Sequence, residues 1–100
     1  PVMDTTSHTA DHSSSALFEP TTCGDLQLKN RIVHPAMTRA RCAGRVPNAE
    51  NVKYYSARAT AGMIVTEASS VSALANGFCD SPGMYTAEQA AGWSAVTQAV

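Results

Sequence analysis

The chain has 100 residues, of which 44% are apolar and only 15% are charged, and its net charge at pH 7 is −1. This charge excludes the basic surface of a nucleic-acid or anionic-membrane binder, and no apolar run reaches the length of a membrane-spanning helix. The large core formers Leu, Ile, Val and Phe total 16 residues whereas Ala alone contributes 17, so the composition is typical of a segment that further chain covers.

Residues 1–16 are rich in Ser, Thr, His and Asp and contain almost nothing to bury. This composition predicts a disordered N-terminal tail, followed by a folded region over residues 17–100. His8 and His12 stand four residues apart, but no further ligand type completes a metal site around them, so we predict none.

The chain has three cysteines, Cys23, Cys42 and Cys79. Their spacing matches neither a zinc site nor a redox pair, so we expect free thiols. The first residues also lack the basic start and apolar run of a secretory signal. Together these features favour a soluble protein in the cytoplasm.

The first structural signals after the tail indicate a small hairpin. An apolar entry at Leu17–Pro20 ends in proline, and Cys23-Gly24-Asp25 is a turn signal. Leu26 and Leu28 alternate with polar neighbours after that turn, and we predict that both face inward.

The next stretch, Asn30–Arg41, has the pattern of a buried strand that opens onto a functional loop. We expect a strand over Arg31–Met37 whose regular part ends near Pro35, because proline cannot donate a ladder hydrogen bond. In a parallel barrel the chemistry lies at the carboxyl ends of the strands, so a site would begin at Thr38. His34 could serve as a ligand or a proton donor, although an imidazole with a local hydrogen-bond partner is the favoured interpretation.

A helix should follow. Asn48 is a plausible N-cap, and Glu50 lies in the first turn, where the helix dipole favours an acidic side chain. Val52, Tyr55 and Ala59 recur at helical spacing and predict the buried face.

A second strand should come directly after this helix. Gly62 stands where a left-handed C-cap would end the helix, and Met63–Thr66 is an apolar run typical of a strand buried on both faces. The resulting strand–helix–strand unit predicts two parallel strands.

A long irregular stretch, Ser69–Tyr85, then leads to a second helix. Loops of this length are usually functional. Thr86 is the expected N-cap, with Glu88 in the first turn. The predicted apolar stripe consists of Ala91, Ala95, Val96 and Ala99.

These motifs, taken in order, resemble the Old Yellow Enzyme family over residues 17–100. The individual motifs are short, but many of them fall in the family's order and spacing. They are Leu17–Pro20, Gly24-Asp25-Leu26, Lys29–Val33, Met37-Thr38-Arg39, Val46-Pro47-Asn48, Tyr54-Tyr55, Arg58-Ala59, Ala61-Gly62, Ile64–Ala68, Gly77, Pro82-Gly83, Tyr85, Glu88-Gln89 and Trp93.

The resemblance implies an α/β fold, the (β/α)8 TIM barrel, of which this chain would supply an N-terminal hairpin and roughly the first two βα units. It also implies an FMN-dependent ene-reductase. Such an enzyme reduces activated C=C bonds of small α,β-unsaturated carbonyl compounds and takes its hydride from NADPH or NADH. The flavin carries the hydride chemistry, and the protein orients and tunes it. A homo-oligomer is compatible with this reading.

The resemblance also assigns roles to five positions. Ala36 and Met37 would pass close to the flavin with their backbone, and Thr38 would hydrogen-bond its carbonyl edge. Ala68 would bring its backbone against the same ring edge. Phe78 matches a position lining the substrate pocket, where many relatives carry tyrosine.

The resemblance places no catalytic residue in this chain. The family's substrate-binding His/Asn or His/His pair, its proton-donor tyrosine and its phosphate-binding arginine belong to later strands. Tyr54 and Tyr55 fit a helix face that packs on the barrel, and Tyr85 fits a turn. Glu67 could be an acid beside the site, but a structural hydrogen-bonding carboxylate is the favoured interpretation.

A second hypothesis comes from a different functional class. A truncated, catalytically inactive relative would act through binding or association, because two βα units alone would leave barrel edges exposed. Intact mass and flavin absorbance would separate the two hypotheses.

Overall fold

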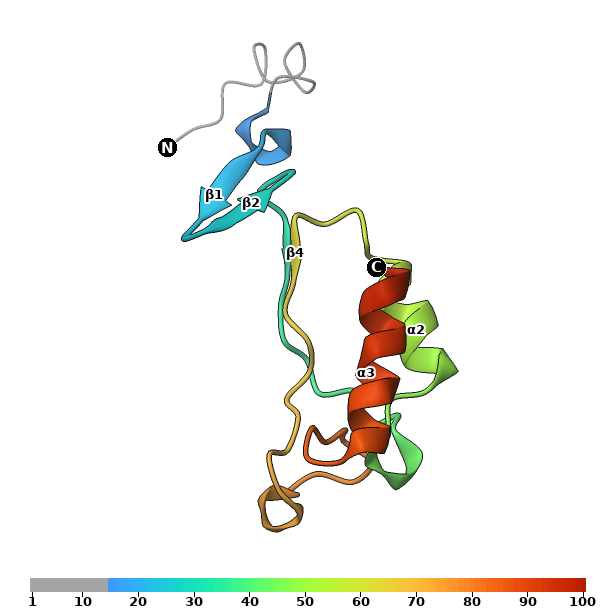
Figure 1. Ribbon diagram of the computed structural model, residues 1–100. Coiled ribbons are helices and arrows are strands. Elements are labelled where there is room, and N and C mark those ends of the chain that lie inside the picture. Colours follow the sequence, from blue (N-terminus) through green and yellow to red (C-terminus); the bar gives the residue numbers. More distant parts are fainter. Residues whose placement is uncertain (1–14) are drawn as a thin grey trace, which may run out of the picture.

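The computed structural model describes residues 15–100. The predicted tail over residues 1–16, with His8 and His12, lies almost entirely outside the described residues. The described chain forms two α-helices, two two-stranded sheets and three short 3₁₀ turns (Figure 1). In order these are η2 (Ala16–Phe18), β1 (Thr21–Cys23), β2 (Leu26–Leu28), β3 (Val33–His34), η3 (Ala43–Arg45), α2 (Ala49–Ser56), β4 (Met63–Ile64), η4 (Ala73–Ala75) and α3 (Ala87–Ala99).

The hairpin is confirmed, but the predicted burial of its leucines is wrong. β1 pairs antiparallel with β2, and Gly24 makes the turn at a φ of +60°, a left-handed conformation that glycine adopts without strain. The side chain of Leu26 is 55% exposed, and Leu28 is half-buried. Figure 1 shows the reason, since the hairpin extends from one end of the molecule, away from both helices.

β3 and β4 form the predicted parallel pair, with Val33 opposite Met63 and His34 opposite Ile64. The regular strand stops directly before Pro35, as expected. The prediction that the second strand is buried on both faces is wrong, because both of its residues are half-buried. Within residues 15–100 this sheet has two strands only, so both of its edges are open.

Helix α2 begins where the sequence predicts. The Asn48 side chain accepts a hydrogen bond of 2.9 Å from the Glu50 amide, and the Asn51 side chain accepts one of 2.9 Å from the Asn48 amide. This reciprocal capping satisfies two backbone donors that the first helical turn leaves free. The helix ends at Ser56, so Ala59 lies in the following turns rather than on the helix.

Gly62 is therefore not the C-cap, and this prediction is wrong. Its amide instead donates 2.8 Å to the carbonyl of Ile32, across the beginning of the β3–β4 pair. A Cβ atom on Gly62 would overlap the carbonyl oxygen of Asn30. The glycine is needed for a close approach between two backbone segments.

Helix α3 has the predicted N-cap, with reciprocal hydrogen bonds between Thr86 and Gln89. Its buried face differs from the predicted alanine stripe, of which only Val96 is buried. The exposed members are Ala91, Ala95 and Ala99, and the buried residues of the helix are Gln89, Trp93 and Val96.

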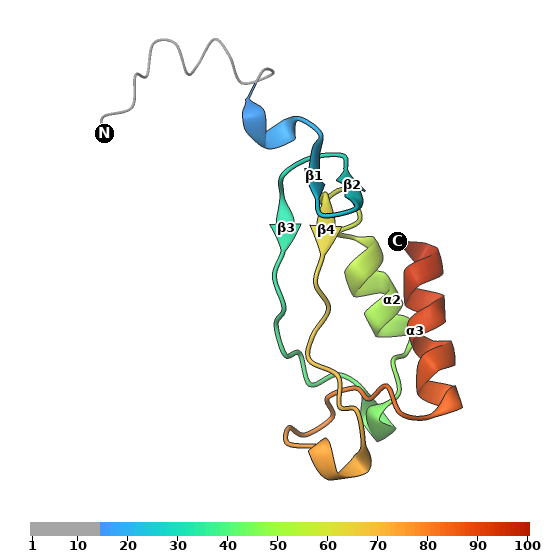
Figure 2. The same ribbon diagram turned by 60° about the vertical axis from the view of Figure 1, so that its left-hand side comes forward.

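The core lies between the two helices and the sheet. Tyr55 of α2 packs against Trp93 of α3 with ring centroids 6.0 Å apart, and Val96 completes the buried cluster. Figure 2 shows α2 and α3 side by side next to the β3–β4 pair. A large aromatic ring buries far more apolar area than an alanine methyl group does. Trp93 therefore anchors α3 to the core, and the alanines of the helix contribute little to this packing.

Candidate functional site

The carboxyl ends of β3 and β4 lead into two extended segments that run together toward the end of the molecule opposite the hairpin (Figures 1 and 2). The Val65 amide donates 2.9 Å to the His34 carbonyl and keeps the two segments paired where the strands end. Parallel strands of a barrel deliver their functional residues at this end.

The two segments hold four of the five residues to which the sequence assigns a site role. Ala36, Met37 and Thr38 follow β3, Ala68 follows β4, and all four are exposed. The Thr38 hydroxyl makes no hydrogen bond within residues 15–100. A small residue, an exposed backbone and an unused hydroxyl at one sheet edge fit the flavin wall that the sequence predicts, and the contacts themselves stay a prediction.

The fifth residue, Phe78, lies in the loop over 69–85 with its side chain 64% exposed. It shares with Ala68 an open hollow of about 260 Å³. Arg45 holds this loop, because its Nη1 atom donates 2.9 Å to the Phe78 carbonyl and 3.2 Å to the Ser81 carbonyl. The structure thus brings Ala68 and Phe78 to one surface.

A buried carboxylate lies beneath the two segments. Glu67 is 1% exposed and accepts hydrogen bonds from the Tyr55 hydroxyl at 3.0 Å, from Nδ2 of Asn51 at 3.5 Å and from the Arg39 amide at 3.3 Å. Cys42 extends the network by donating 3.4 Å to Oδ1 of Asn51. The preferred interpretation of Glu67 as a hydrogen-bonding carboxylate is confirmed.

Burial perturbs two groups of this network. Burial raises the pKa of Tyr55 to about 12, and the hydrogen bond from the Glu67 amide offsets part of that rise. Burial also raises the pKa of the Cys42 thiol, against a lowering by its hydrogen bond to Asn51. Both groups are therefore neutral at physiological pH.

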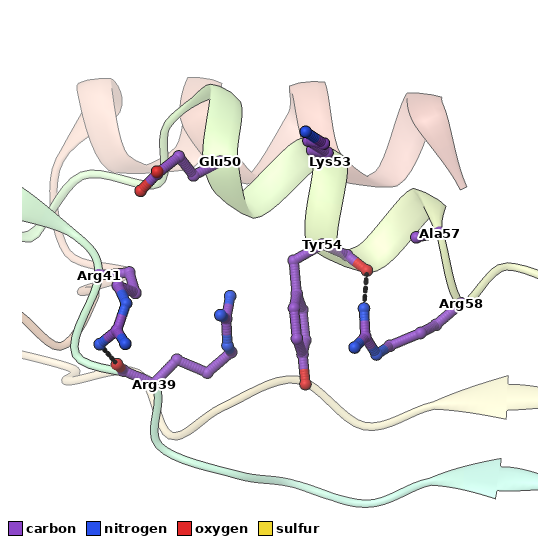
Figure 3. Close-up of a pocket in the computed structure, with 7 residues that line it drawn as sticks. All are labelled: Arg39, Arg41, Glu50, Lys53, Tyr54, Ala57 and Arg58. Carbon is purple, nitrogen blue, oxygen red and sulfur yellow. Dashed lines mark hydrogen bonds between the residues drawn. The ribbon is translucent and has the colours of Figure 1, made fainter.

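Tyr54 forms a second cluster on the side of α2 that faces the two extended segments (Figure 3). Its ring lies between two guanidinium groups, with Arg39 3.5 Å and Arg58 3.8 Å from the ring centroid (Figure 3). Its hydroxyl pairs with Nε2 of His34 at 3.1 Å, so the local partner expected for this imidazole is confirmed. The cluster lines an open pocket of about 300 Å³ whose residues are Arg39, Arg41, Glu50, Lys53, Tyr54, Ala57 and Arg58.

This cationic cluster was not predicted from the sequence. Tyr54 and Arg58 stand four apart on the helical pattern, and that spacing was the available signal. Arg39 could not be added from spacing alone, because it reaches Tyr54 only through the fold. Tyr85 fits its expected turn, where its hydroxyl accepts 3.1 Å from Nδ2 of Asn76, and this bond lowers the pKa of Tyr85.

Two negative findings apply to residues 15–100. No three His, Cys, Asp or Glu side chains gather there in a way that could hold a metal ion. No helix in the same range has the length and apolar character that a membrane crossing requires.

All three cysteines are free thiols, with Cys23 and Cys79 exposed and Cys42 buried.

The deciding comparison is with a family of flavin enzymes. The family model described as NADH:flavin oxidoreductase / NADH oxidase matches residues 16–100. The chain belongs to this family. The resemblance to the Old Yellow Enzymes drawn from its motifs is thereby confirmed.

Sequence and structure relatives in this flavin oxidoreductase family agree with that assignment. The chain is 39% identical over 85 residues to 12-oxophytodienoate reductase 1 of Oryza sativa subsp. japonica, covering 84% of this chain and 22% of the relative. Morphinone reductase in complex with tetrahydroNAD matches with a TM-score of 0.82 at 40% identity, covering 85% of this chain and 23% of that one. The Old Yellow Enzyme homologue from Zymomonas mobilis matches with a TM-score of 0.80 at 36% identity, covering 85% and 24%.

The chain thus spans about a quarter of the length of its flavin oxidoreductase relatives and corresponds to their N-terminal portion. Their fold is the TIM barrel, so the predicted fold class is confirmed. β3, α2, β4 and α3 are the first two βα units of this barrel, and β1–β2 is the hairpin that precedes them.

Proposed function

We propose that this chain is the N-terminal part of an FMN-dependent oxidoreductase that reduces activated C=C bonds of α,β-unsaturated carbonyl compounds with NADPH or NADH. The observation that carries the proposal is the meeting of two parallel strand exits, one with Ala36–Thr38 and the other with Ala68. Family membership supports the flavin chemistry in general, and the relatives' names supply the reductase class.

The residues at this edge fit an isoalloxazine ring. The Thr38 hydroxyl is free to donate to a carbonyl oxygen of the ring, and Ala68 has no side chain beyond Cβ to prevent close approach. A bound FMN would supply the chemistry of hydride transfer between the nicotinamide and the alkene. The chain's own part is to bind and orient the ring, and a donor at its carbonyl edge favours the charge that reduction places there.

Phe78 supports an apolar wall for the substrate. It lies with Ala68 around the 260 Å³ hollow, and its side chain is 64% exposed. A small apolar enone fits this wall better than a charged substrate does. The catalytic acid and the carbonyl-binding groups belong to the remaining strands of the barrel.

The test uses the intact natural polypeptide. We expect a yellow protein with flavin absorbance that oxidises NADPH or NADH when 2-cyclohexenone is added. Thr38→Val, which keeps the shape and removes the hydroxyl, should weaken FMN binding about tenfold. Thr38→Ser should retain the wild-type affinity. A colourless intact polypeptide that takes up no FMN would contradict the proposal.

The open edges of the β3–β4 sheet support the alternative of a short, inactive relative that acts by association. Ile32, Val33 and Val65 are 38%, 43% and 43% exposed along this sheet, and unpaired edges of this kind invite pairing with another chain. A natural polypeptide with the mass of this chain, colourless and oligomeric, would favour this alternative. A yellow monomer or a small homo-oligomer of greater mass would favour the enzyme.

The free thiols support a cytoplasmic location, since reducing compartments keep cysteines unpaired. Cell fractionation with an antibody against the chain would test it. The net charge of −1 supports a small-molecule partner over a nucleic acid.

A further inference from the structure

The Glu67 carboxylate lies where three segments of the chain meet. Glu67 lies in the segment after β4, directly before Ala68. Its carboxylate contacts Tyr55 and Asn51 of α2 and accepts a hydrogen bond from the Arg39 amide in the segment after β3. A buried carboxylate is costly unless several donors pair with it, and here every contact is a donor aimed at one of its two oxygens.

The Arg39 contact is the informative one. The Arg39 amide belongs to the peptide group that joins Thr38 to Arg39, so the bond of 3.3 Å to Oε1 fixes the backbone on the carboxyl side of Thr38. Ala40 follows with a φ of +55°, a strained value for a residue with a Cβ atom. A backbone in this strained conformation persists only where surrounding contacts hold it. The hydrogen bond from the Arg39 amide to Glu67 is one such contact.

The other end of the carboxylate is fixed to the helix layer. Its Oε2 atom accepts the Tyr55 hydroxyl, and Tyr55 is 1% exposed in the core. The side chain therefore spans from the rigid core to a strand exit, while its own backbone leads into the other exit at Ala68. Glu67 alone therefore sets the distance between the two walls of the candidate site, which are the segments that carry Thr38 and Ala68.

We propose that Glu67 is a positioning residue for the flavin, which acts by joining the Thr38 and Ala68 segments at a fixed distance. This inference rests on the proposed function and adds to it a residue that touches neither FMN nor substrate. The side chain acts through Arg39 on one wall and through its own backbone on the other.

The proposal is tested on the intact polypeptide with Glu67→Ala and three companion variants. Glu67→Ala removes the link, so the Arg39 amide should exchange with solvent about tenfold faster in the flavin-free protein, and the Kd for FMN should rise about tenfold. Glu67→Gln keeps an oxygen acceptor of the same length, so it should restore both values to within about twofold of wild type.

Val96→Ala is the matched stability control. It removes buried methyl groups from the core but leaves every hydrogen bond of Glu67, so it should lower the unfolding midpoint while the FMN Kd changes less than about twofold. Glu67→Asp covers the case in which Glu67→Ala does not fold. Its carboxylate keeps the charge but is one carbon shorter, so it cannot span from Tyr55 to Arg39, and it should also speed exchange at Arg39.

The outcomes separate the two proposals. Unchanged Arg39 exchange in Glu67→Ala or Glu67→Asp, or FMN binding weakened equally by Val96→Ala, would overturn the positioning role. If the wild-type protein binds no FMN but Arg39 exchange still depends on Glu67, the link stands as a structural one, and the proposed function and its flavin positioning fail. The position of the flavin absorption band adds a spectroscopic readout that loss of stability alone does not move.

Discussion

The Tyr55 hydroxyl donates 3.0 Å to Oε2 of Glu67 and accepts 3.1 Å from the backbone amide of the same residue. One phenol thus holds both the side chain and the main chain of Glu67, which lies in the segment after β4. The ring itself packs on Trp93. Helix α2 is joined to the strand exit by a polar contact inside an apolar layer, and such a contact is costly to break because its partners are left unpaired.

Burial of the Tyr55 hydroxyl makes the stability of the fold depend on pH in the alkaline range. The pKa of Tyr55 is raised to about 12 in the folded protein, above its ordinary value of 10.0. The stabilisation is fully present below pH 10 and is lost as the pH rises through about 12, because the unfolded phenol ionises first. Urea unfolding at pH 8 and pH 11 should show a lower midpoint at pH 11. In Tyr55→Phe this drop should be smaller, and an equal drop in both proteins would contradict the assignment.

Gly62 should tolerate no side chain. Gly62→Ala would place a Cβ atom on the Asn30 carbonyl and disturb the hydrogen bond that the Gly62 amide donates to the Ile32 carbonyl. We therefore expect a loss of about 1–3 kcal/mol in the free energy of unfolding. Gly77→Ala is the control, because no atom lies within 4 Å of the Cβ it would add. Thermal unfolding of both variants measures the difference, and similar melting temperatures would contradict the close approach.

The three thiols should differ in reactivity. Cys42 is 0% exposed and burial raises its pKa, whereas Cys23 and Cys79 are exposed. Thiolate is the reactive form, so the native protein should react quickly with a disulfide reagent at two cysteines and at Cys42 only after unfolding. Peptide mapping after a short reaction identifies the labelled residues. Early labelling of Cys42 would show that its surroundings open readily.

Gln89 should stabilise the start of α3 strongly. Its Oε1 atom accepts the amides of Tyr85 at 2.8 Å and Thr86 at 3.1 Å, and the side chain is 3% exposed. Gln89→Ala leaves both donors unpaired, so we expect a loss of about 1–3 kcal/mol in chemical unfolding. Gln98→Ala on the same helix removes only an exposed contact to Ser94 and should change stability by less than about 0.5 kcal/mol. Equal losses would show that the cap contributes little.

The features that the sequence predicted correctly are local ones. The caps at Asn48 and Thr86 and the stop at Pro35 depend on groups within a few residues of each other, so their patterns suffice. Gly62 was wrongly assigned because its requirement comes from Asn30, which is distant in sequence. The prediction that the alanine stripe of α3 is buried was wrong for a similar reason. The packing of Trp93, and not the number of alanines on a face, decides which face of the helix is buried.

In the candidate site, too, the features that follow from local sequence patterns were predicted, and those that depend on tertiary contacts were not. Thr38 and Ala68 could be proposed because each follows an apolar strand pattern and matches a family motif. The link between them through Glu67 could not be predicted, because it requires the tertiary contact of Arg39 with a side chain 28 residues away. The stacking of Arg39 on Tyr54 was missed for the same reason.

The hairpin stands at the end of the sheet opposite the strand exits (Figure 1). Nζ of Lys29 donates 2.7 Å to the Ala59 carbonyl and Nδ2 of Asn30 donates 2.8 Å to the Thr60 carbonyl, so the chain leaving β2 is fastened to the turns after α2. The hairpin is thus held at the amino ends of the strands. Its sequence is consequently free to change or to be engineered for solubility, for instance at the exposed Leu26, without disturbing the strand exits at the opposite end.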